Sequence, residues 1–175
     1  LKGPKDRGTG QVPKERERVM GKSRKRYPEG LTVQHVSTYL VREATAASAE
    51  TITDDRDAAH LFREAFDFDH SDREVFVAAA LNTKNRVLGV WQVSVGSLNA
   101  SIVHPRELFR QAVMLAAASV VVGHNHPSGD PTPSGADIQL TRRLVKAGDV
   151  LGIEVLDHVV VGDTSHASLR DLGLM

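Results

Sequence analysis

The chain has 175 residues, of which 41% are hydrophobic and 25% charged, a composition typical of a soluble globular protein with room for one domain. It contains no cysteine, which excludes disulfides, iron–sulfur clusters and thiolate zinc sites, so any metal must be bound by His, Asp or Glu. The apolar runs are too short to span a bilayer and no signal sequence is visible, so we expect a cytoplasmic protein without membrane contact.

Charge is unevenly distributed along the chain, although the total is zero. Residues 1–30 contain ten Lys or Arg and four Asp or Glu, and the remainder carries the matching acidic excess. We expect this segment to be a disordered basic tail, with a solvated tail and a weak DNA-binding arm as the two interpretations. Its most basic stretch, "KSRKR", has no aromatic residue before Tyr27 and therefore offers no surface for base stacking.

Between this tail and the first strand, the pattern indicates helices. Residues 31–44 have a weak amphipathic pattern, and residues 47–53 have the composition of a linker. Residues 55–66 carry apolar side chains at helical spacing, with acidic residues in the first turn. We therefore expect residues 31–67 to form a helical N-terminal extension of a globular domain over residues 68–175.

From residue 68 onward, strands and helices alternate. Two strands joined by a tight turn predict a hairpin, and a helix that begins near Pro105 leads to a short, wholly apolar strand that we place in the centre of a sheet. The expected elements are strands 74–81 and 87–96, a helix over 104–118, strand 119–123, a helix from about 136 to 148 that ends near Gly148 or Gly152, strand 154–162 and a short C-terminal strand. This order predicts a mixed α/β sandwich, not a repeating βαβ array.

The stretch "GHNHPSGDPTPSGAD", residues 123–137, holds the candidate metal ligands. His124 and His126 stand two residues apart after the apolar strand, so in extended backbone their side chains point to the same side. A loop rich in Pro and Gly can bring Asp137 back to them, and two imidazoles with one carboxylate would leave a fourth position open, as in catalytic zinc sites. The alternative is that the histidines belong to a simple turn and that Ser134 and Asp137 form a helix capping box.

The spacing His-x-His, seven residues, Ser, two residues, Asp resembles the JAMM (MPN+) metalloprotease signature. The stretches "LNTKNRVLG", "VSVGSLNASIVHPRELF", "GHNHPSGDPTPS" and "GIEVLDHVVVGD" also resemble the RadC-type JAMM proteins of bacteria. The resemblance implies an α-β-α sandwich with a mixed sheet, of the MPN/JAMM (cytidine-deaminase-like) type, with residues 68–175 as its catalytic domain. The chain resembles the short members of this family, since residues 1–67 show no helix-hairpin-helix pattern.

The resemblance also implies a role for each motif residue. His124, His126 and Asp137 would bind zinc (Zn2+), and Ser134 would help to orient or stabilise the developing oxyanion. The family has an upstream glutamate as general acid/base at the start of a strand, and Glu74 occupies that position.

Other interpretations of the glutamates remain open. Glu74 could be a solvated charge at the end of a strand, and Glu64 and Glu107 are competitors for the catalytic role. Glu107 lies in the first turn of a helix, where its charge already interacts favourably with the helix dipole.

Several polar residues near the motif are given other roles. We interpret His104 as a helix-start residue, His158 as a core histidine or a neighbour of a ligand, and Asn125 as a side chain that faces away from the metal and pins the loop. A carboxylate hydrogen-bonded to His124 or His126 is also expected. Three polar residues could line the substrate groove: Ser97, Asn99 and Ser101.

The leading functional hypothesis is a zinc-dependent hydrolase that cleaves a peptide or isopeptide bond through a metal-activated water. The alternative is a DNA-associated repair or recombination accessory protein that binds nucleic acid through residues 1–30. A third hypothesis is a metal-binding scaffold without catalysis. The peptide or protein substrate and the oligomeric state do not follow from the sequence.

Overall fold

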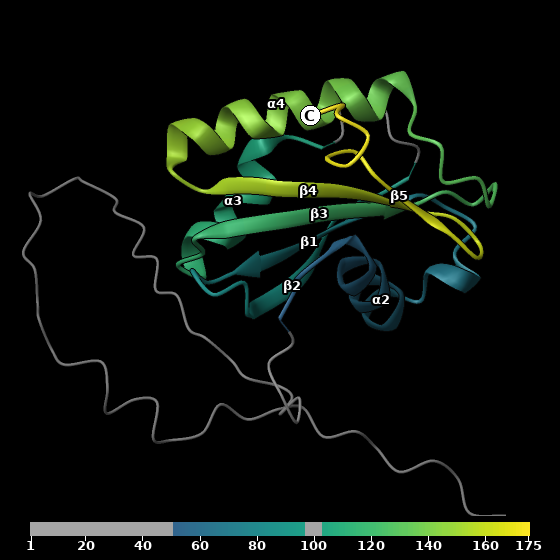
Figure 1. Cartoon of the computed structure of the whole chain (residues 1–175), viewed down its shortest axis with the longest axis horizontal. Helices are drawn as coiled ribbons and strands as arrows, with labels where there is room; N and C mark the ends of the chain where they lie inside the picture. The colour runs from purple at the N-terminus through teal and green to yellow at the C-terminus, as the bar shows by residue number, and fades with distance from the viewer. Residues whose placement is uncertain (1–50, 97–102) are drawn as a thin grey trace, which may run out of the picture. The chain divides into compact units, whose positions relative to one another are not determined.

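The computed structural model describes residues 51–96 and 103–175. In this part of the chain, five strands form one mixed sheet in the order β2-β1-β3-β4-β5, with helices on both faces (Figure 1). The elements are α2 (Asp55–Phe66), η1 (Phe68–His70), β1 (Val75–Leu81), β2 (Val87–Val95), α3 (Pro105–Met114), β3 (Ser119–Asn125), α4 (Gly135–Leu151), β4 (Glu154–Val161) and β5 (His166–Ser168). The predicted α-β-α sandwich is confirmed.

Several sequence-based expectations lie outside the described residues: the basic tail 1–30, the helix 31–44 and the polar residues Ser97, Asn99 and Ser101. The domain boundaries drawn from the sequence stay predictions. Of the helices in residues 51–96 and 103–175, none is both long and apolar enough to cross a membrane.

The central strand of the sheet is β3, as its wholly apolar start predicted. It pairs antiparallel with β1 and parallel with β4, and all seven of its residues are buried. β1 also pairs with β2 in the predicted hairpin, and β5 pairs antiparallel with β4. β3 runs two residues further than expected and includes His124, so this candidate ligand stands on the rigid end of a buried strand.

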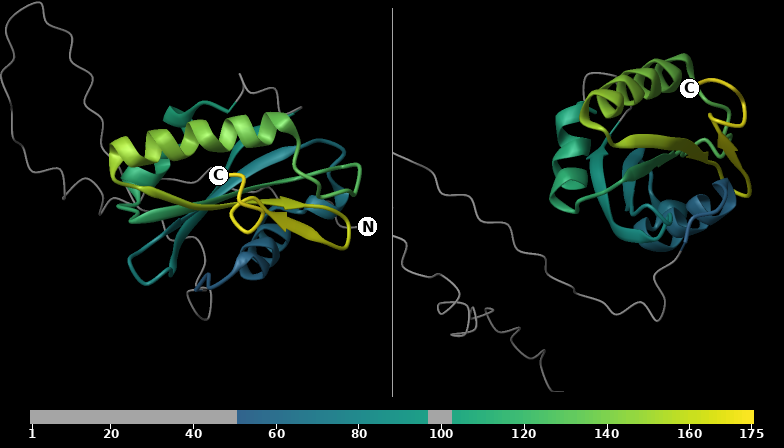
Figure 2. Two further views of the ribbon diagram at one scale, coloured as in Figure 1. Left: turned by 45° about the horizontal axis from the view of Figure 1, so that its top comes forward. Right: turned by 60° about the vertical axis from the view of Figure 1, so that its left-hand side comes forward.

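Side chains of β1 alternate between two cores, although every residue of the strand is apolar. Odd-numbered residues such as Val77 pack with Phe62 of α2, and even-numbered residues such as Phe76 pack with Leu108 of α3 and Leu144 of α4. Helices α3 and α4 therefore cover one face of the sheet and α2 the other, as Figures 1 and 2 show. His124 lies on the α3/α4 face, where its ring stacks on Phe76.

The end of α3 differs from the sequence-based prediction. α3 ends at Met114 and not near residue 118, because the chain turns at Ala116 (φ 51°) and the Ala117 amide donates back to the Ala112 carbonyl. This turn is needed to lead directly into β3, and it overrides the helix propensity of the alanines. α4 begins at Gly135, directly after its Ser134 cap, and ends at Leu151 before Gly152 (φ 68°), which is one of the two glycines expected to end it.

The segment interpreted as a linker is packed at its C-terminal end. Ile52 is buried in the same core as α2, its amide donates to the Asn85 carbonyl, and Thr51 forms a bridge with Arg86. Helix α2, which the sequence assigned to an N-terminal extension, thus shares its core with the sheet.

The close packing of α2 on β3 predicts the effect of one methyl group. A Cβ at Gly123 would lie 2.7 Å from the Phe62 ring and 2.9 Å from the Val159 carbonyl oxygen, whereas a Cβ at Gly135 would meet nothing within 4 Å. We expect Gly123→Ala to lower the free energy of unfolding by about 1–3 kcal/mol and Gly135→Ala to change it by less than about 1 kcal/mol. Urea denaturation monitored by circular dichroism measures both, and equal stability of the two variants would contradict this packing.

Candidate metal centre

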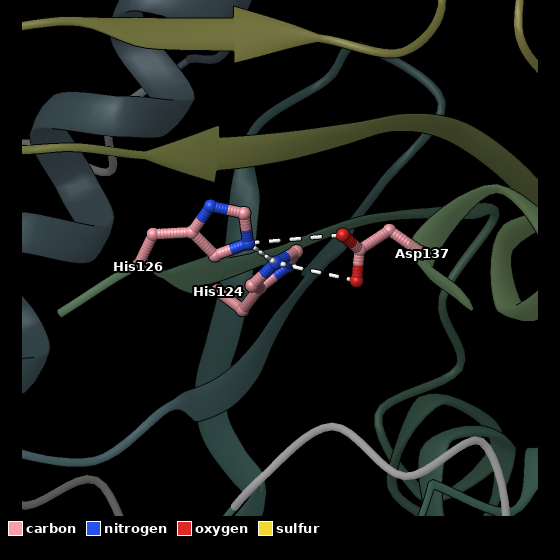
Figure 3. A group of neighbouring side chains, drawn as sticks. All are labelled: His124, His126 and Asp137. Carbon is pink, nitrogen blue, oxygen red and sulfur yellow. Dashed lines mark hydrogen bonds and ion pairs between the residues drawn. The ribbon is translucent and has the colours of Figure 1, made fainter. Parts of the chain in front are cut away.

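Three candidate ligands converge at the C-terminal end of β3 and the N-terminal end of α4. His124 Nε2 lies 2.9 Å from His126 Nε2 and 3.5 Å from Asp137 Oδ1, and His126 Nε2 lies 3.7 Å from Asp137 Oδ2. Figure 3 shows the two rings and the carboxylate pointing toward one another. Within residues 51–96 and 103–175, this is the cluster of His and acidic side chains with the spacing of a metal site.

The loop between the histidines and α4 is fixed by backbone hydrogen bonds at the end of β4. The His126 amide donates to the Val161 carbonyl, the Gly129 amide donates to the His126 carbonyl, and the Asp163 amide donates to the Gly129 carbonyl. Gly129 has φ 82°, and a Cβ there would meet the Asp163 carboxylate at 2.5 Å, so the turn requires glycine. The loop thereby returns the chain to the sheet at the start of α4.

Asp137 is both a helix cap and a candidate ligand. The Ser134 hydroxyl accepts the Asp137 amide at 3.2 Å, and Asp137 Oδ2 accepts the Ser134 amide at 2.7 Å, which is the predicted capping box. The partial positive charge at a helix N-terminus also favours a carboxylate at this position. Within the cap, Asp137 Oδ2 is hydrogen-bonded to the Ser134 amide, and this orients Asp137 Oδ1 toward His124.

A hydrogen bond determines which ring nitrogen of His126 carries the proton in the neutral form. His126 Nδ1 lies 2.7 Å from the Asp130 backbone carbonyl, which can only accept, so Nδ1 donates. In the neutral ring, Nε2 is then an unprotonated nitrogen that faces His124 and Asp137. The Asp137 carboxylate raises the pKa of His126 against the opposing effect of burial, and the Asp130 carbonyl and the Glu74 charge add to this increase.

His124 and Asp137 are held in the protonation states that can bind a metal, a neutral imidazole and a charged carboxylate. Burial lowers the pKa of His124 well below its ordinary value, and the nearby His158 ring adds to the effect, so His124 is neutral. Burial by itself would raise the pKa of Asp137, but His126, His124 and Ser134 outweigh it and hold this pKa well below its ordinary value. A neutral imidazole beside a carboxylate is a donor set that suits zinc.

The spacing of the donor atoms fits a tetrahedral ion. Bonds of about 2.0–2.1 Å in tetrahedral geometry place two donors about 3.3–3.4 Å apart. The three separations, 2.9, 3.5 and 3.7 Å, lie on both sides of that value. His124 and Asp137 are almost fully buried, whereas the His126 side chain is 13% exposed, so the open side of the cluster is at His126.

Glu74 lies beside this cluster at the start of β1. Phe76 pairs with His124 in the antiparallel β1–β3 ladder, and continuing this register places Glu74 opposite His126. Asn125 fixes this end of β1: its Oδ1 accepts the Val75 amide at 2.7 Å and its Nδ2 donates to the Arg73 carbonyl at 3.0 Å. Asn125 therefore faces away from the ligands, as expected, and pins the strand that carries Glu74.

The two competing glutamates have other contacts. Glu64 lies 3.4 Å from His60 on the exposed side of α2, across the sheet from the ligands, and Glu107 forms ion pairs with Arg106 and Arg110. His104 is the N-cap of α3, where its Nδ1 accepts the Arg106 amide, which confirms its interpretation as a helix-start residue.

The expected carboxylate partner of the histidines is replaced by other groups. His124 Nδ1 contacts His158 Nε2 at 2.8 Å, and His126 Nδ1 donates to a backbone carbonyl, so the prediction of a carboxylate was wrong. His158 is a buried neighbour of a ligand, as one interpretation held, and its Nδ1 contacts Thr141 Oγ1 at 2.6 Å. Thr141 was missed; the available signal was a hydroxyl four residues after Asp137 on the buried side of α4.

Comparison with known proteins matches these features to one family. The family model "RadC-like JAB domain" matches residues 52–174 and so includes α2. UPF0758 proteins of Moorella thermoacetica and Desulforamulus reducens are 51% and 50% identical over 75% and 78% of this chain, and one of Geotalea uraniireducens is 57% identical over 59% of it.

These matches cover 57%, 60% and 45% of the relatives' own lengths, so the chain spans less than two thirds of the curated relatives that it matches. The family model, by contrast, covers well over half of the chain and includes both the sheet and the candidate ligands. The chain therefore belongs to the RadC-like JAB domain family, whose wider superfamily includes zinc metalloproteases.

Proposed function

We propose that this protein is a zinc-dependent hydrolase of peptide or isopeptide amide bonds. The observation that carries the proposal is the convergence of His124, His126 and Asp137 on one point with donor spacing suited to zinc. Three protein ligands leave a fourth position open, which is the arrangement of catalytic rather than structural zinc. When bound, zinc supplies a water that ionises near neutral pH and a positive charge that polarises the substrate carbonyl.

Glu74 is the proposed general acid/base. It is half-buried at the start of β1, and its negative charge acts on His126. From this position its carboxylate would accept the proton of the attacking water and later donate that proton to the nitrogen of the leaving amine. Asn125 holds the backbone on both sides of Glu74, so the carboxylate is presented from a fixed position.

Ser134 is the proposed partner of the substrate oxygen. Its Oγ accepts the Asp137 amide, and in the described part of the chain its own hydroxyl proton has no protein acceptor. The side chain is exposed at the edge of the cluster. The hydroxyl would therefore donate to the oxygen of the tetrahedral intermediate while its lone pair continues to cap α4.

The alternative of DNA association remains a separate proposal. It depends on the charge of residues 1–30, which lie outside the described residues. The metal centre and the DNA-binding proposal are independent of each other, because the centre is formed by residues 124–137.

The first test separates metal binding from catalysis. The purified chain should hold about one zinc, the double variant His124→Ala, His126→Ala should hold none, and Glu74→Gln should keep the metal but lose about a hundredfold or more in turnover. Metal analysis and cleavage products from a proteomic screen of wild type against Glu74→Gln measure the two effects. Glu107→Gln is the matched control, because Glu107 pairs with arginines on α3.

Each outcome of this test has a separate meaning. Zinc retained by the double variant would exclude the site, and full turnover by Glu74→Gln would exclude Glu74. A chain that binds zinc at this site but produces no cleavage products would support a metal-binding scaffold and overturn the hydrolase.

A second test separates the two roles of Ser134. Glycine replaces serine at an N-cap with a loss of only a few tenths of a kcal/mol, so Ser134→Gly should leave stability almost unchanged. Loss of the hydroxyl donor should nevertheless reduce turnover by about 10- to 1,000-fold. Thermal denaturation and steady-state rates measure the two effects, and wild-type turnover in Ser134→Gly would limit Ser134 to capping.

A third test uses the raised pKa of His126. Below that pKa a proton occupies the nitrogen that binds the metal, so zinc must displace it, and the raised pKa extends this competition toward neutral pH. We expect the apparent zinc affinity to fall by about tenfold per pH unit as the pH is lowered below the His126 pKa. Competition with a chelator of known protonation constants, combined with an NMR titration of His126 in the metal-free chain, measures this, and a pH-independent affinity over that range would contradict it.

A further inference from the structure

A buried chain of hydrogen bonds joins the backbone of one candidate ligand to the ring of another. Thr141 Oγ1 lies 2.6 Å from the Asp137 carbonyl oxygen and 2.6 Å from His158 Nδ1, and His158 Nε2 lies 2.8 Å from His124 Nδ1. All four residues are at most 1% exposed. This series of hydrogen bonds thus leads from α4 through β4 to β3 without contact with solvent.

Two local features bring His158 and Thr141 together. Thr141 lies one helical turn after Asp137, so its hydroxyl reaches the Asp137 carbonyl within α4. β4 contains one extra residue, because Val120 pairs with Val155 but Val121 pairs with Asp157. This bulge reverses the alternation of β4, so that Val155 and Val159 lie in opposite cores and His158, not Asp157, faces His124.

The direction of each hydrogen bond follows from the Asp137 carbonyl. A carbonyl can only accept, and two oxygens 2.6 Å apart repel each other unless a proton lies between them, so the Thr141 hydroxyl donates to it. The hydroxyl has only this one proton. Toward His158 it can therefore only accept, and His158 Nδ1 must donate.

The position of the proton on His158 determines the position of the proton on His124. The His158 ring is fully buried, and among the described residues no carboxylate forms a hydrogen bond with it, so the neutral ring with a single N–H is favoured. That N–H is used at Nδ1, which leaves Nε2 as an acceptor. His124 Nδ1 must then donate, and the Nε2 of His124 that faces His126 and Asp137 is unprotonated before any metal arrives.

We propose that His158, held by Thr141, is a positioning residue that fixes His124 in the tautomer with its proton on Nδ1 and aims the free Nε2 at the metal. The proposal rests on the proposed zinc site and deepens it. Asp137 acts twice: its carboxylate is a ligand, and its carbonyl is the end of the chain that sets the tautomer of another ligand. Partners of metal-bound histidines typically contribute about 10- to 100-fold to metal affinity.

The first experiment examines the metal-free chain of 175 residues. Long-range 1H–15N NMR spectra distinguish the two neutral tautomers of each histidine, with assignment by comparison with His158→Gln and His126→Ala. We expect His124 and His158 both to carry the proton on Nδ1. Protonation of His124 on Nε2 would overturn the proposal, and this readout does not depend on metal binding or on activity.

The second experiment removes the acceptor for His158. Thr141→Val keeps the shape of the side chain but removes the hydroxyl, whereas Thr141→Ser keeps the hydroxyl and is the matched control. We expect Thr141→Val to weaken zinc binding by about 10- to 100-fold and to produce mixed tautomers of His124, and Thr141→Ser to bind within about threefold of wild type. Zinc affinity of Thr141→Val within about twofold of wild type, with unchanged tautomers, would also overturn it.

The outcomes distinguish this inference from the proposed function. If the wild-type chain binds no zinc, the hydrolase proposal fails, while the tautomer of His124 in the metal-free chain still decides the positioning role. If Thr141→Val does not fold, the wild-type NMR spectra decide it alone. A chain with the expected tautomers and zinc affinities but no cleavage activity would support the positioning role and reject the hydrolase.

Discussion

The chemistry of the candidate metal centre depends on the Nε2 atoms of His124 and His126, which face each other at 2.9 Å beside the buried carboxylate of Asp137. Both rings use their Nδ1 protons elsewhere, His124 toward His158 and His126 toward the Asp130 carbonyl, so their Nε2 lone pairs would repel each other if nothing lay between them. A positive charge removes this repulsion. A proton on His126 would be such a charge in the absence of metal, and the Asp137 carboxylate raises the pKa of His126 in that direction. Zinc would take the place of this proton with a higher charge and with Asp137 as a third ligand.

The tripeptide His124-Asn125-His126 contains two candidate ligands and the side chain that holds the backbone around the proposed base, Glu74. Strand alternation sends the two histidines to the face under α4, and it sends Asn125 the other way, to the backbone at the start of β1. Asn125 fixes this backbone on both sides of Glu74. Glu74 directly precedes β1, and His126 directly follows β3, so both are held next to a buried antiparallel pair of strands. Such fixed placement is what proton transfer requires.

Local patterns in the sequence predicted most of the elements and the three candidate ligands that the structure brings together, because those features depend on residues close together in the chain. The apolar alternation of the strands, the capping box at Ser134 and the His-x-His spacing are of this kind. The His158–Thr141 chain could not be found in this way, since it depends on the parallel pairing of β3 with β4 and on one extra residue in β4. The early end of α3 at Met114, before the turn at Ala116, was missed for the same reason: the connection to β3, not alanine propensity, decides it.

Solvent exposure of the side chains increases from one side of the cluster to the other, and this limits how a substrate could approach. His124 and His158 of the sheet and Thr141 of α4 are fully buried, His126 is partly exposed, and Ser134 is exposed at the start of the helix. Among the described residues the cluster is therefore open on the side of His126 and Ser134, and we propose that water and the substrate approach from that side. On that side the proposed groups act on different atoms: Glu74 on the water and the leaving nitrogen, and Ser134 on the carbonyl oxygen. The buried side holds the candidate ligands, and burial strengthens each hydrogen bond that fixes the position of a proton there.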